Sequence, residues 1–317
     1  MQKRLLRVLP WVVTAGLLAW LFHRIDFAQF KAGVQGSAPW MVPVVLASVA
    51  AVYLADSFAI WKTFGWFLTR MSFTDVLLVR GATYLLAAIN YNVGQGAIVY
   101  FVHKNAGTTI IRGIATILLV LGVNVLALLF LTTGGIAVAP ELPRLVKYFV
   151  ALAWGGLAVY VALVAIRPRW LDKPAFEVLL NAGLGGHARA LLVRLPHIAA
   201  LMAFQYSALR AFGVEVPVGY AIATLPIAFF VAVLPISVQG LGTTQAMMIY
   251  LFGRYAPGKQ EAAIVAASLM AQAIAFAFQA LLGVVCLRSR VGRALQASAQ
   301  EQTAAPPAQP GSPASAT

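Results

Sequence analysis

Two short polar segments lie inside long apolar stretches, and they hold the side chains best suited to bind a polar ligand. The first reads Asn90-Tyr91-Asn92-Val93-Gly94-Gln95-Gly96, and the second extends from Leu234 to Gln245. Glycine permits backbone conformations that other residues avoid and proline lacks a backbone donor, so both segments should interrupt a helix. At membrane depth, the backbone groups that such a break exposes need side chains, water or a bound ligand as partners.

The polar side chains of these segments have two interpretations. In the first, they only form hydrogen bonds with the broken backbone. In the second, which we favour because two such segments occur at matching places, they also line a path for a polar headgroup. The candidate binding residues are Asn90, Asn92, Gln95, Ser237, Gln239 and Thr243, together with Gln272 of the last apolar run.

Polar residues also recur on one face of two apolar runs. In the last run, Gln272 shares a helix face with Ser268 and Gln279. In an earlier run, Thr116 and Asn124 lie eight residues apart, which also places them on one face. These stripes either complete a wet groove beside the polar segments or form hydrogen bonds to neighbouring helices.

Catalytic and cofactor chemistry has little support in the sequence. A phosphate-binding Gly-x-x-x-x-Gly-Lys-Ser/Thr loop is absent, because Gln260 follows Gly258-Lys259. The four histidines have no metal-ligand spacing, and the nine acidic residues do not pair within any apolar run. The single cysteine, Cys286, excludes an intramolecular disulfide. We therefore expect no enzyme activity, metal or cofactor, and the scarcity of acids also disfavours a transferase acting on a lipid phosphate.

The composition is that of a membrane protein. Of 317 residues, 61% are hydrophobic and 10% charged, against roughly 45 to 50% and about 25% in soluble domains. Because about 20 apolar residues span a bilayer as a helix, the useful count is of apolar runs. Six are uninterrupted: Val8–Phe22, Pro39–Trp61, Ile114–Val138, Tyr148–Ile166, Leu195–Phe212 and Ala262–Leu287.

Basic clusters predict how these runs are oriented. The net charge of +14 fits the excess of Lys and Arg in cytoplasmic segments better than it fits nucleic-acid binding. The three strongest clusters are Lys3 to Arg7, Arg167 to Arg194, which we interpret as a loop, and Arg288 to Arg293. All three are cytoplasmic if the interrupted stretch Phe73–Val102 enters and leaves the membrane from the same side.

The predicted fold is therefore an all-α polytopic membrane protein with about six transmembrane helices and two re-entrant helical hairpins in an inverted repeat. The hairpins, Phe73–Val102 and Val216–Phe252, would enter from opposite faces. The alternative is seven or eight full crossings. Residues 1–290 would form one transmembrane domain, and 291–317, rich in Ala, Pro, Ser and Gln, a disordered cytoplasmic tail.

Two charged residues lie well away from the ends of these apolar stretches. Asp56 lies six residues before Lys62, and Arg80 lies ten residues after Arg70, so both should sit at a similar, shallow depth from the cytoplasmic surface. An isolated charge at a helix centre costs about 2.5 to 3.5 kcal/mol on insertion scales. We therefore expect Asp56 and Arg80 to pair, with either a structural role or a role in coupling transport.

The polar segments resemble motifs of the transmembrane, flippase-like domain of the lysylphosphatidylglycerol synthase family. The resemblance covers about Leu5 to Leu287 and is clearest in Leu234-Pro235-Ile236-Ser237 followed by Gly240-Leu241-Gly242. Family members typically have Leu-Pro-x-Ser-x-Gly-Gly-x-Gly and then an acid three positions later. Here Gln239 replaces the first paired glycine and Gln245 stands where the acid is expected. The family's first motif has a Pro, then Gly-Glu, then an Arg. Around Gly96, this chain has Asn92, Ala97 and Tyr100 in place of the Pro, the Glu and the Arg.

The resemblance implies that the chain moves a lipid or lipid-linked substrate between leaflets, as a stand-alone domain without the soluble aminoacyltransferase. The partners would be a membrane phospholipid or a polyprenyl-linked lipid, with anionic headgroups held at the cytoplasmic face by the basic residues of Arg167 to Arg194. The alternative is a non-catalytic accessory or scaffold subunit, whose partner would be a lipid-modifying enzyme. We expect the cell (inner) membrane, with both termini cytoplasmic.

Overall fold

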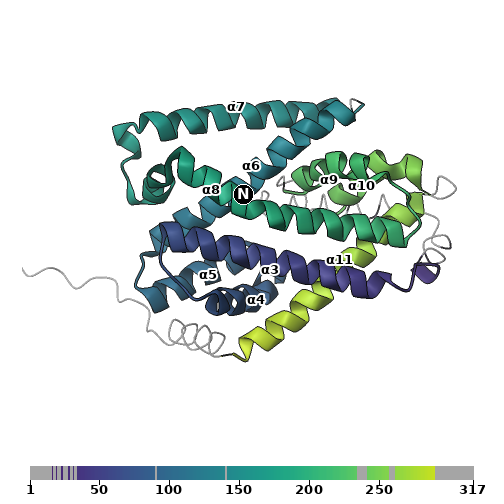
Figure 1. Cartoon of the computed structure of the whole chain (residues 1–317), viewed down its shortest axis with the longest axis horizontal. Coiled ribbons are helices and arrows are strands. Elements are labelled where there is room, and N and C mark those ends of the chain that lie inside the picture. Colours follow the sequence, from purple (N-terminus) through teal and green to yellow (C-terminus); the bar gives the residue numbers. More distant parts are fainter. Residues whose placement is uncertain are drawn as a thin grey trace, which may run out of the picture.

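The computed structural model describes residues 34–89, 91–139, 141–233, 241–256 and 261–289, and five isolated residues nearer the N-terminus. Apart from two of those isolated positions, the predicted crossing at Val8–Phe22 lies outside the described residues, as does the predicted tail at 291–317. The described residues form nine α-helices, two short 3-10 helices and no strand (Figure 1). The prediction of an all-α protein is therefore confirmed for this part of the chain.

Four of the described helices are long and apolar enough to cross a membrane. They are α3 (Met41–Phe67), α6 (Ile110–Val138), α7 (Arg144–Ile166) and α11 (Glu261–Leu287). Three of them contain a predicted apolar run entirely, and α3 contains all but the first two residues of its run. Their outer faces carry exposed large apolar side chains, above all on α7, where Leu152 is 72% exposed and Ile166 74%. Such faces suit contact with lipid tails, which are also apolar.

The two interrupted stretches each fold as a pair of shorter helices. The first stretch forms α4 (Phe73–Ile89) and α5 (Tyr91–Ala106), and the second forms α9 (Val218–Val233) and α10 (Thr243–Phe252). Within each pair the two helices pack against one another. The expectation that glycine interrupts the helix was wrong for Gly94 and Gly96, which lie inside α5. In the second segment, Gly242 immediately precedes α10, with φ at 85°, as a residue that stops a helix can.

The sequence interpretation of Arg167 to Arg194 as a loop was wrong. Only its beginning is a connection, which includes a short 3-10 helix at Arg169–Leu171. The rest belongs to α8 (Pro174–Ala211), a long helix that bends at Gly183, where φ is 56°. The predicted crossing Leu195–Phe212 is thus the second part of this helix, and α8 is not among the four candidate spans.

Packing assigns the helix termini to two ends of the bundle. Phe67, the last residue of α3, packs near Ala115 at the start of α6 and Val178 at the start of α8. Arg112 and Glu177 form an ion pair of 3.7 Å between the same two helix starts. At the other end, the start of α3 (Met41) shares a core cluster with the end of α8 (Leu209) and the start of α11.

Each helix pair therefore begins and ends at the same end of the bundle, and the two pairs are at opposite ends. The α4–α5 pair connects the end of α3 to the start of α6, and these two termini lie together. The α9–α10 pair connects the end of α8 to the start of α11, at the opposite end. In Figure 1, the first pair lies in the left half of the molecule and the second in the right half.

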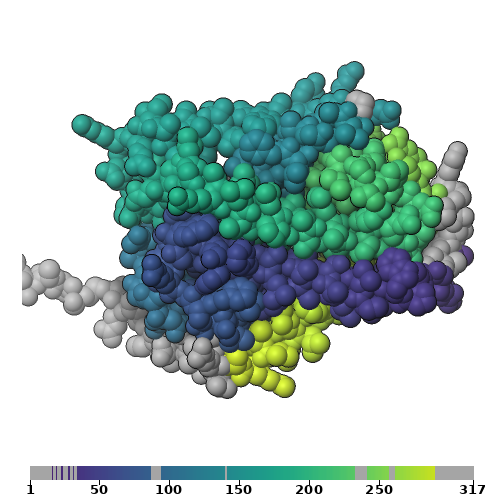
Figure 2. Space-filling model, viewed as in Figure 1, coloured from purple at the N-terminus to yellow at the C-terminus, as the bar shows by residue number. Residues whose placement is uncertain are grey.

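The two long helices that precede the pairs form the centre of the bundle. α3 and α8 pack along each other (Figure 2), and α6 packs against α8 on another side. The first helix of each pair packs against the long helix that follows the other pair: α4 against α11, and α9 against α6. This arrangement encloses the middle of α3, where three charged side chains, Asp56, Arg80 and Arg194, meet.

Candidate functional site

A buried cluster of charged and polar side chains lies where α3, α4, α6 and α8 meet. Its centre is the carboxylate of Asp56 on α3, whose side chain is 3% exposed. Arg80 of α4 places Nε 2.6 Å from Asp56 Oδ2. Arg194 of α8 donates a hydrogen bond from its guanidinium to the other oxygen, Oδ1. One carboxylate therefore joins two arginines from different helices.

Further groups fix the two arginines in place. Arg194 Nε donates to Asn124 Oδ1 of α6 at 2.9 Å, which holds the plane of this guanidinium. The Arg80 guanidinium lies over the ring of Tyr84, 5.1 Å from its centroid. The Tyr84 ring in turn contacts Tyr53 of α3, at 5.8 Å between centroids. Cation–π and charge-assisted contacts of this kind are strong where water is excluded.

His197 adds an ionisable group beside the carboxylate. It follows Arg194 by one turn on α8, and its Nδ1 lies 3.9 Å from Asp56 Oδ1. The same ring nitrogen lies 3.3 Å from the carbonyl oxygen of Val52, four residues before Asp56 on α3. His197 is buried. Three nitrogen-bearing side chains, Arg80, Arg194 and His197, therefore lie within 4 Å of one carboxylate.

The cluster lies at mid-length of two candidate spans. Asp56 comes fifteen residues after the first residue of α3 and eleven before its last, which is about 22 Å and about 16 Å along the axis. Asn124 is fourteen residues from either terminus of α6. The expected shallow depth of Asp56 was inferred from an apolar run that stops at Trp61, whereas α3 continues as helix to Phe67.

The structure brings together the two charged residues singled out from sequence, Asp56 and Arg80. Sequence reasoning missed Arg194 as their partner, because it assigned this residue to a cytoplasmic basic loop that binds lipid headgroups. In the structure, Arg194 is buried and engaged with Asp56, whereas Arg189 remains exposed. The spacing of Arg194 and His197 was the available signal, since residues three apart share a helix face.

The polar segments fall mostly outside the described residues. This holds for Asn90, Ser237 and Gln239, and for the side chain of Asn92, whose backbone belongs to α5. Gln95 is a buried residue of α5. The candidates Thr243 and Gln272 lie on α10 and α11.

Gln245 shows how the second polar segment joins the bundle. Its Oε1 accepts a hydrogen bond of 2.7 Å from the backbone N–H of Gly242, where φ is 85°. Its Nε2 donates to Gln272 Oε1 of α11 at 3.4 Å. Gln245, which stands where the family motif has an acid, therefore caps the start of α10 and links it to α11. For this residue, satisfying the broken backbone is an observed role.

The residues of the two polar stripes differ in the hydrogen bonds that they form. The hydroxyl of Thr116 donates to the carbonyl of Arg112, and that of Ser268 to the carbonyl of Val265, both within their own helix. Asn124 and Gln272 instead reach neighbouring helices. Asn124 and Gln272 therefore form interhelical hydrogen bonds, whereas the hydroxyls of Thr116 and Ser268 bond within their own helices.

Comparison with known proteins agrees with this architecture. The family model for the lysylphosphatidylglycerol synthase TM region matches residues 7–283 of the sequence. This range includes all four helices of the charged cluster. A search of curated proteins finds no match. A match over most of the chain, together with apolar helices long enough to cross a membrane, shows an integral membrane protein with a membrane lipid-related role. The chain is a member of the lysylphosphatidylglycerol synthase transmembrane-region family.

Proposed function

We propose that the protein translocates a lipid or lipid-linked substrate between membrane leaflets and performs no catalysis. The observation that carries this proposal is the charged cluster at mid-length of α3 and α6. Charged groups at membrane depth are costly and occur mainly where they pair or where they line a path for a polar substrate. Here Arg80 belongs to one of two helix pairs that start from opposite ends of the bundle, which suits a headgroup that must pass the bilayer centre.

The arrangement of the pairs supports re-entrant hairpins in an inverted repeat. In such a repeat, each contact has a counterpart in the other half. The packing of α4 on α11 is matched by that of α9 on α6. Glycines permit the close approach in both places: a Cβ on Gly135 of α6 would lie 2.0 Å from the carbonyl oxygen of Ala223 on α9, and one on Gly283 of α11 would lie 2.6 Å from Leu85 of α4.

Charge at the two ends supports the predicted orientation in the cell (inner) membrane. We define the basic end as the one with the α3–α4, α5–α6 and α7–α8 connections. Its described connections and adjoining turns hold seven basic and three acidic residues, against four and three at the other end. By the positive-inside rule, we propose that the basic end is cytoplasmic, and we keep the prediction that both termini lie on that side. The basic residues are Arg70, Lys104, Arg112, Arg167, Arg169, Lys173 and Arg288.

The polar segments remain the proposed headgroup contacts beside the cluster. The first segment continues into the start of α5 and the second into the start of α10, and the two pairs start from opposite ends of the bundle. We propose that Asn90, Asn92, Gln95, Ser237, Gln239 and Thr243 share the broken backbone with a headgroup. Gln272 would contribute through its contact with Gln245, which anchors the second segment.

Transport in proteoliposomes tests this function. The purified wild-type protein should move phospholipids with a fluorescent acyl chain between leaflets, measured by dithionite quenching, faster than protein-free vesicles do. An Asn92→Ala, Gln239→Ala double variant should fold but move lipid at least about tenfold more slowly. A tenfold lower rate corresponds to an activation barrier that is higher by about 1.4 kcal/mol. Normal transport by this variant would place the headgroup path elsewhere, and no lipid movement by the wild type would refute translocation.

A further inference from the structure

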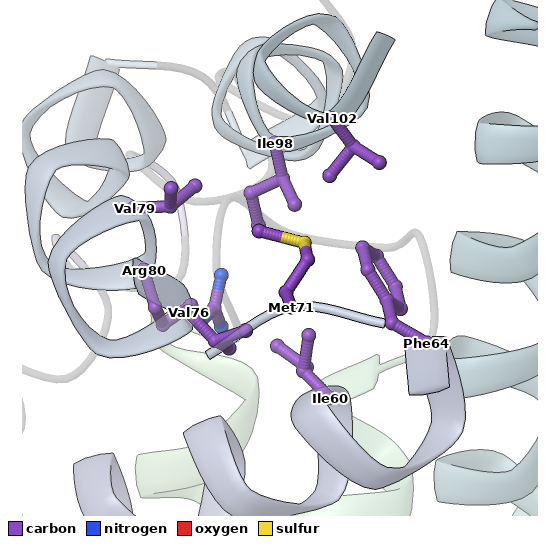
Figure 3. Close-up of a pocket in the computed structure, with 8 residues that line it drawn as sticks. All are labelled: Ile60, Phe64, Met71, Val76, Val79, Arg80, Ile98 and Val102. Atoms are coloured by element: carbon purple, nitrogen blue, oxygen red, sulfur yellow. The ribbon is translucent and has the colours of Figure 1, made fainter. Parts of the chain in front are cut away.

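The cavity that reaches the charged cluster is too small for a lipid headgroup. It lies between α3, α4 and α5 and reaches Arg80, and its other lining residues are apolar (Figure 3). Its volume is about 10 Å³, which is about what one water molecule needs. A headgroup that enters from the bilayer and approaches the cluster therefore requires a helix to move.

The helix with the weakest packing is α7. Of the four described helices that are long enough to cross a membrane, it has the fewest buried residues, three of 23, against nine or more in each of α3, α6 and α11. A Cβ on Gly155 or Gly156 of α7 would have no neighbour within 4 Å. Apolar contacts therefore do little to fix the position of α7, because lipid tails offer its side chains similar contacts.

This helix covers the place where α6 and α8 meet beside the charged cluster. In Figure 1, α7 runs along the upper edge of the bundle, over α6 and α8. Ala127 comes three residues after Asn124 on α6, and Ile198 comes four residues after Arg194 on α8. The apolar contact between α6, α7 and α8 is therefore about one helical turn from the hydrogen bond between Arg194 and Asn124. We call this group the covered cluster, and its buried members are Ala127, Leu128, Leu129, Val150, Ile198 and Phe230.

Hydrogen bonds connect α7 to the bend in α8. The hydroxyl of Tyr160 lies 2.5 Å from Nε2 of His187, and Nδ1 of His187 lies 2.6 Å from the carbonyl oxygen of Gly183. A carbonyl oxygen can only accept, so Nδ1 carries the hydrogen; Nε2 of the neutral ring then accepts, and Tyr160 donates. A chain of two hydrogen bonds therefore runs from α7 through His187 to the residue at which α8 bends.

A second contact joins the end of α7 to the same bend. Arg167, which directly follows α7, donates from Nη2 to the carbonyl oxygen of Leu180 at 2.6 Å. Leu180 and Gly183 lie in the turn of α8 at which the helix bends. The contacts from α7 to α8 therefore converge on one turn, and they are directional hydrogen bonds rather than apolar packing.

We propose that α7 is a lateral gate of the translocation path and that Tyr160 and His187 form its latch. When their hydrogen bond breaks, α7 can swing away from α8 and open the covered cluster to the bilayer. Trp154, whose Nε1 donates to Oγ1 of Thr133 on α6 at 2.8 Å, supplies the pivot. Ala127, six residues before Thr133 on α6, lies between the pivot and the basic end, as the latch does. The inference rests on the proposed translocation and adds the route by which a lipid enters, between α6 and α8.

The reactivity of a buried cysteine tests the latch. In a Cys286→Ser background, Ala127→Cys places a thiol in the covered cluster at a position that is 2% exposed. Adding Tyr160→Phe removes the donor hydroxyl and keeps the ring beside His187. Labelling of this thiol by N-ethylmaleimide should then be at least about threefold faster, because the open population rises. Equal labelling rates with and without Tyr160→Phe would overturn the latch.

The matched control is a cysteine at a buried alanine outside the covered cluster. Ala266 of α11 is 0% exposed and belongs to the core that contains the end of α8. The labelling rate of Ala266→Cys should be the same with and without Tyr160→Phe. A rate that rises equally at both positions would mean that the substitution loosens the whole bundle, and it would overturn a movement confined to α7.

Fixing the latch tests the gate. A Tyr160→Cys, His187→Cys double variant in the same background is linked with a short bis-methanethiosulfonate reagent, whose disulfides can be reduced. The linked protein should move phosphatidylglycerol with a fluorescent acyl chain at least about tenfold more slowly than the same protein after reduction. The single variant His187→Cys, which the reagent cannot link to α7, should move lipid at the same rate before and after reduction.

The two experiments separate failure of the gate from failure of the proposed function. If the linked protein moves lipid as fast as the reduced protein, α7 is not a gate and translocation stands. If no form of the protein moves lipid, translocation is refuted and the labelling of Ala127→Cys decides alone. Faster labelling with Tyr160→Phe would then support a latched α7, and equal rates would overturn it.

Discussion

Arg194 Nε donates a hydrogen bond of 2.9 Å to Asn124 Oδ1, and this contact joins the middle of α6 to α8 at the charged cluster. The same arginine binds Asp56 on α3. One side chain therefore connects three of the helices that form the centre of the bundle. A residue that looked like a topology signal in the sequence is instead an organising contact of the buried site.

Removing the carboxylate from the cluster should destabilise the protein. Asp56→Ala leaves two buried arginines without their shared counter-anion, and breaking a buried ion pair in this way typically costs about 3 to 5 kcal/mol. The free energy of unfolding, measured by chemical denaturation in detergent micelles, should fall by about that amount. The control is Arg112→Gln, whose exposed pair with Glu177 is worth about 1 kcal/mol or less. Equal stability of the two variants would contradict the account of the cluster.

Two adjacent glycines of α6 should respond oppositely to a methyl group. A Cβ on Gly135 would lie 2.0 Å from the carbonyl oxygen of Ala223, so Gly135→Ala must push α6 and α9 apart and lower the melting temperature. Gly134 has no neighbour within 4 Å of a Cβ, so Gly134→Ala should stabilise by up to about 1 kcal/mol through helix propensity. A Gly135→Ala protein as stable as the Gly134→Ala protein would refute the close crossing.

The equivalent crossing of α4 and α11 can be tested with a disulfide. A Cβ on Gly81 would lie 3.2 Å from the Cβ of Cys286, close to the range of roughly 3.5 to 4.5 Å found in disulfides. Gly81→Cys should therefore form a disulfide with Cys286 on mild oxidation, measured as loss of free thiols. Gly96→Cys, a position with open space around its Cβ, should not. Free thiols that persist in oxidised Gly81→Cys would argue against this packing.

Accessibility to an impermeant thiol reagent tests the topology. In a Cys286→Ser background, a cysteine at Asp172 of the basic end should be labelled only after the membrane is opened. A cysteine at Glu215, at the opposite end and with a side chain 79% exposed, should be labelled from outside. Labelling of the Asp172 position in intact cells would overturn both the cytoplasmic basic end and the re-entrant hairpins.

The sequence predicted the helical class and the positions of the described spans, because these follow from apolar length. It also paired Asp56 with Arg80 on the cost of burying a charge. It did not predict that α5 continues through Gly94 and Gly96, because glycine lowers helix propensity without preventing a helix. It did not reveal the buried position of Arg194, because an arginine that favours the cytoplasmic side and one that pairs inside the bundle look the same within a basic segment. Only the fold of α8 against α3 distinguishes them.

The length of α3 explains a second difference. Apolar patterning ended this helix at Trp61, but the helix continues through Lys62 to Phe67. The ammonium of Lys62 lies 4.3 Å from the centroid of the Trp61 ring, so the helix accommodates the charge without ending. The end of an apolar run therefore did not mark the end of this helix.

The central claim, movement of lipid across the bilayer, is tested most directly by the wild-type protein in vesicles without nucleotide or any added energy source. Phosphatidylglycerol labelled on an acyl chain is placed in both leaflets, and external dithionite is added. The account predicts that inner-leaflet label is also quenched, at a rate that rises with the number of protein molecules per vesicle. Inner-leaflet fluorescence that stays protected at every protein density, in vesicles shown to contain folded protein, would contradict it.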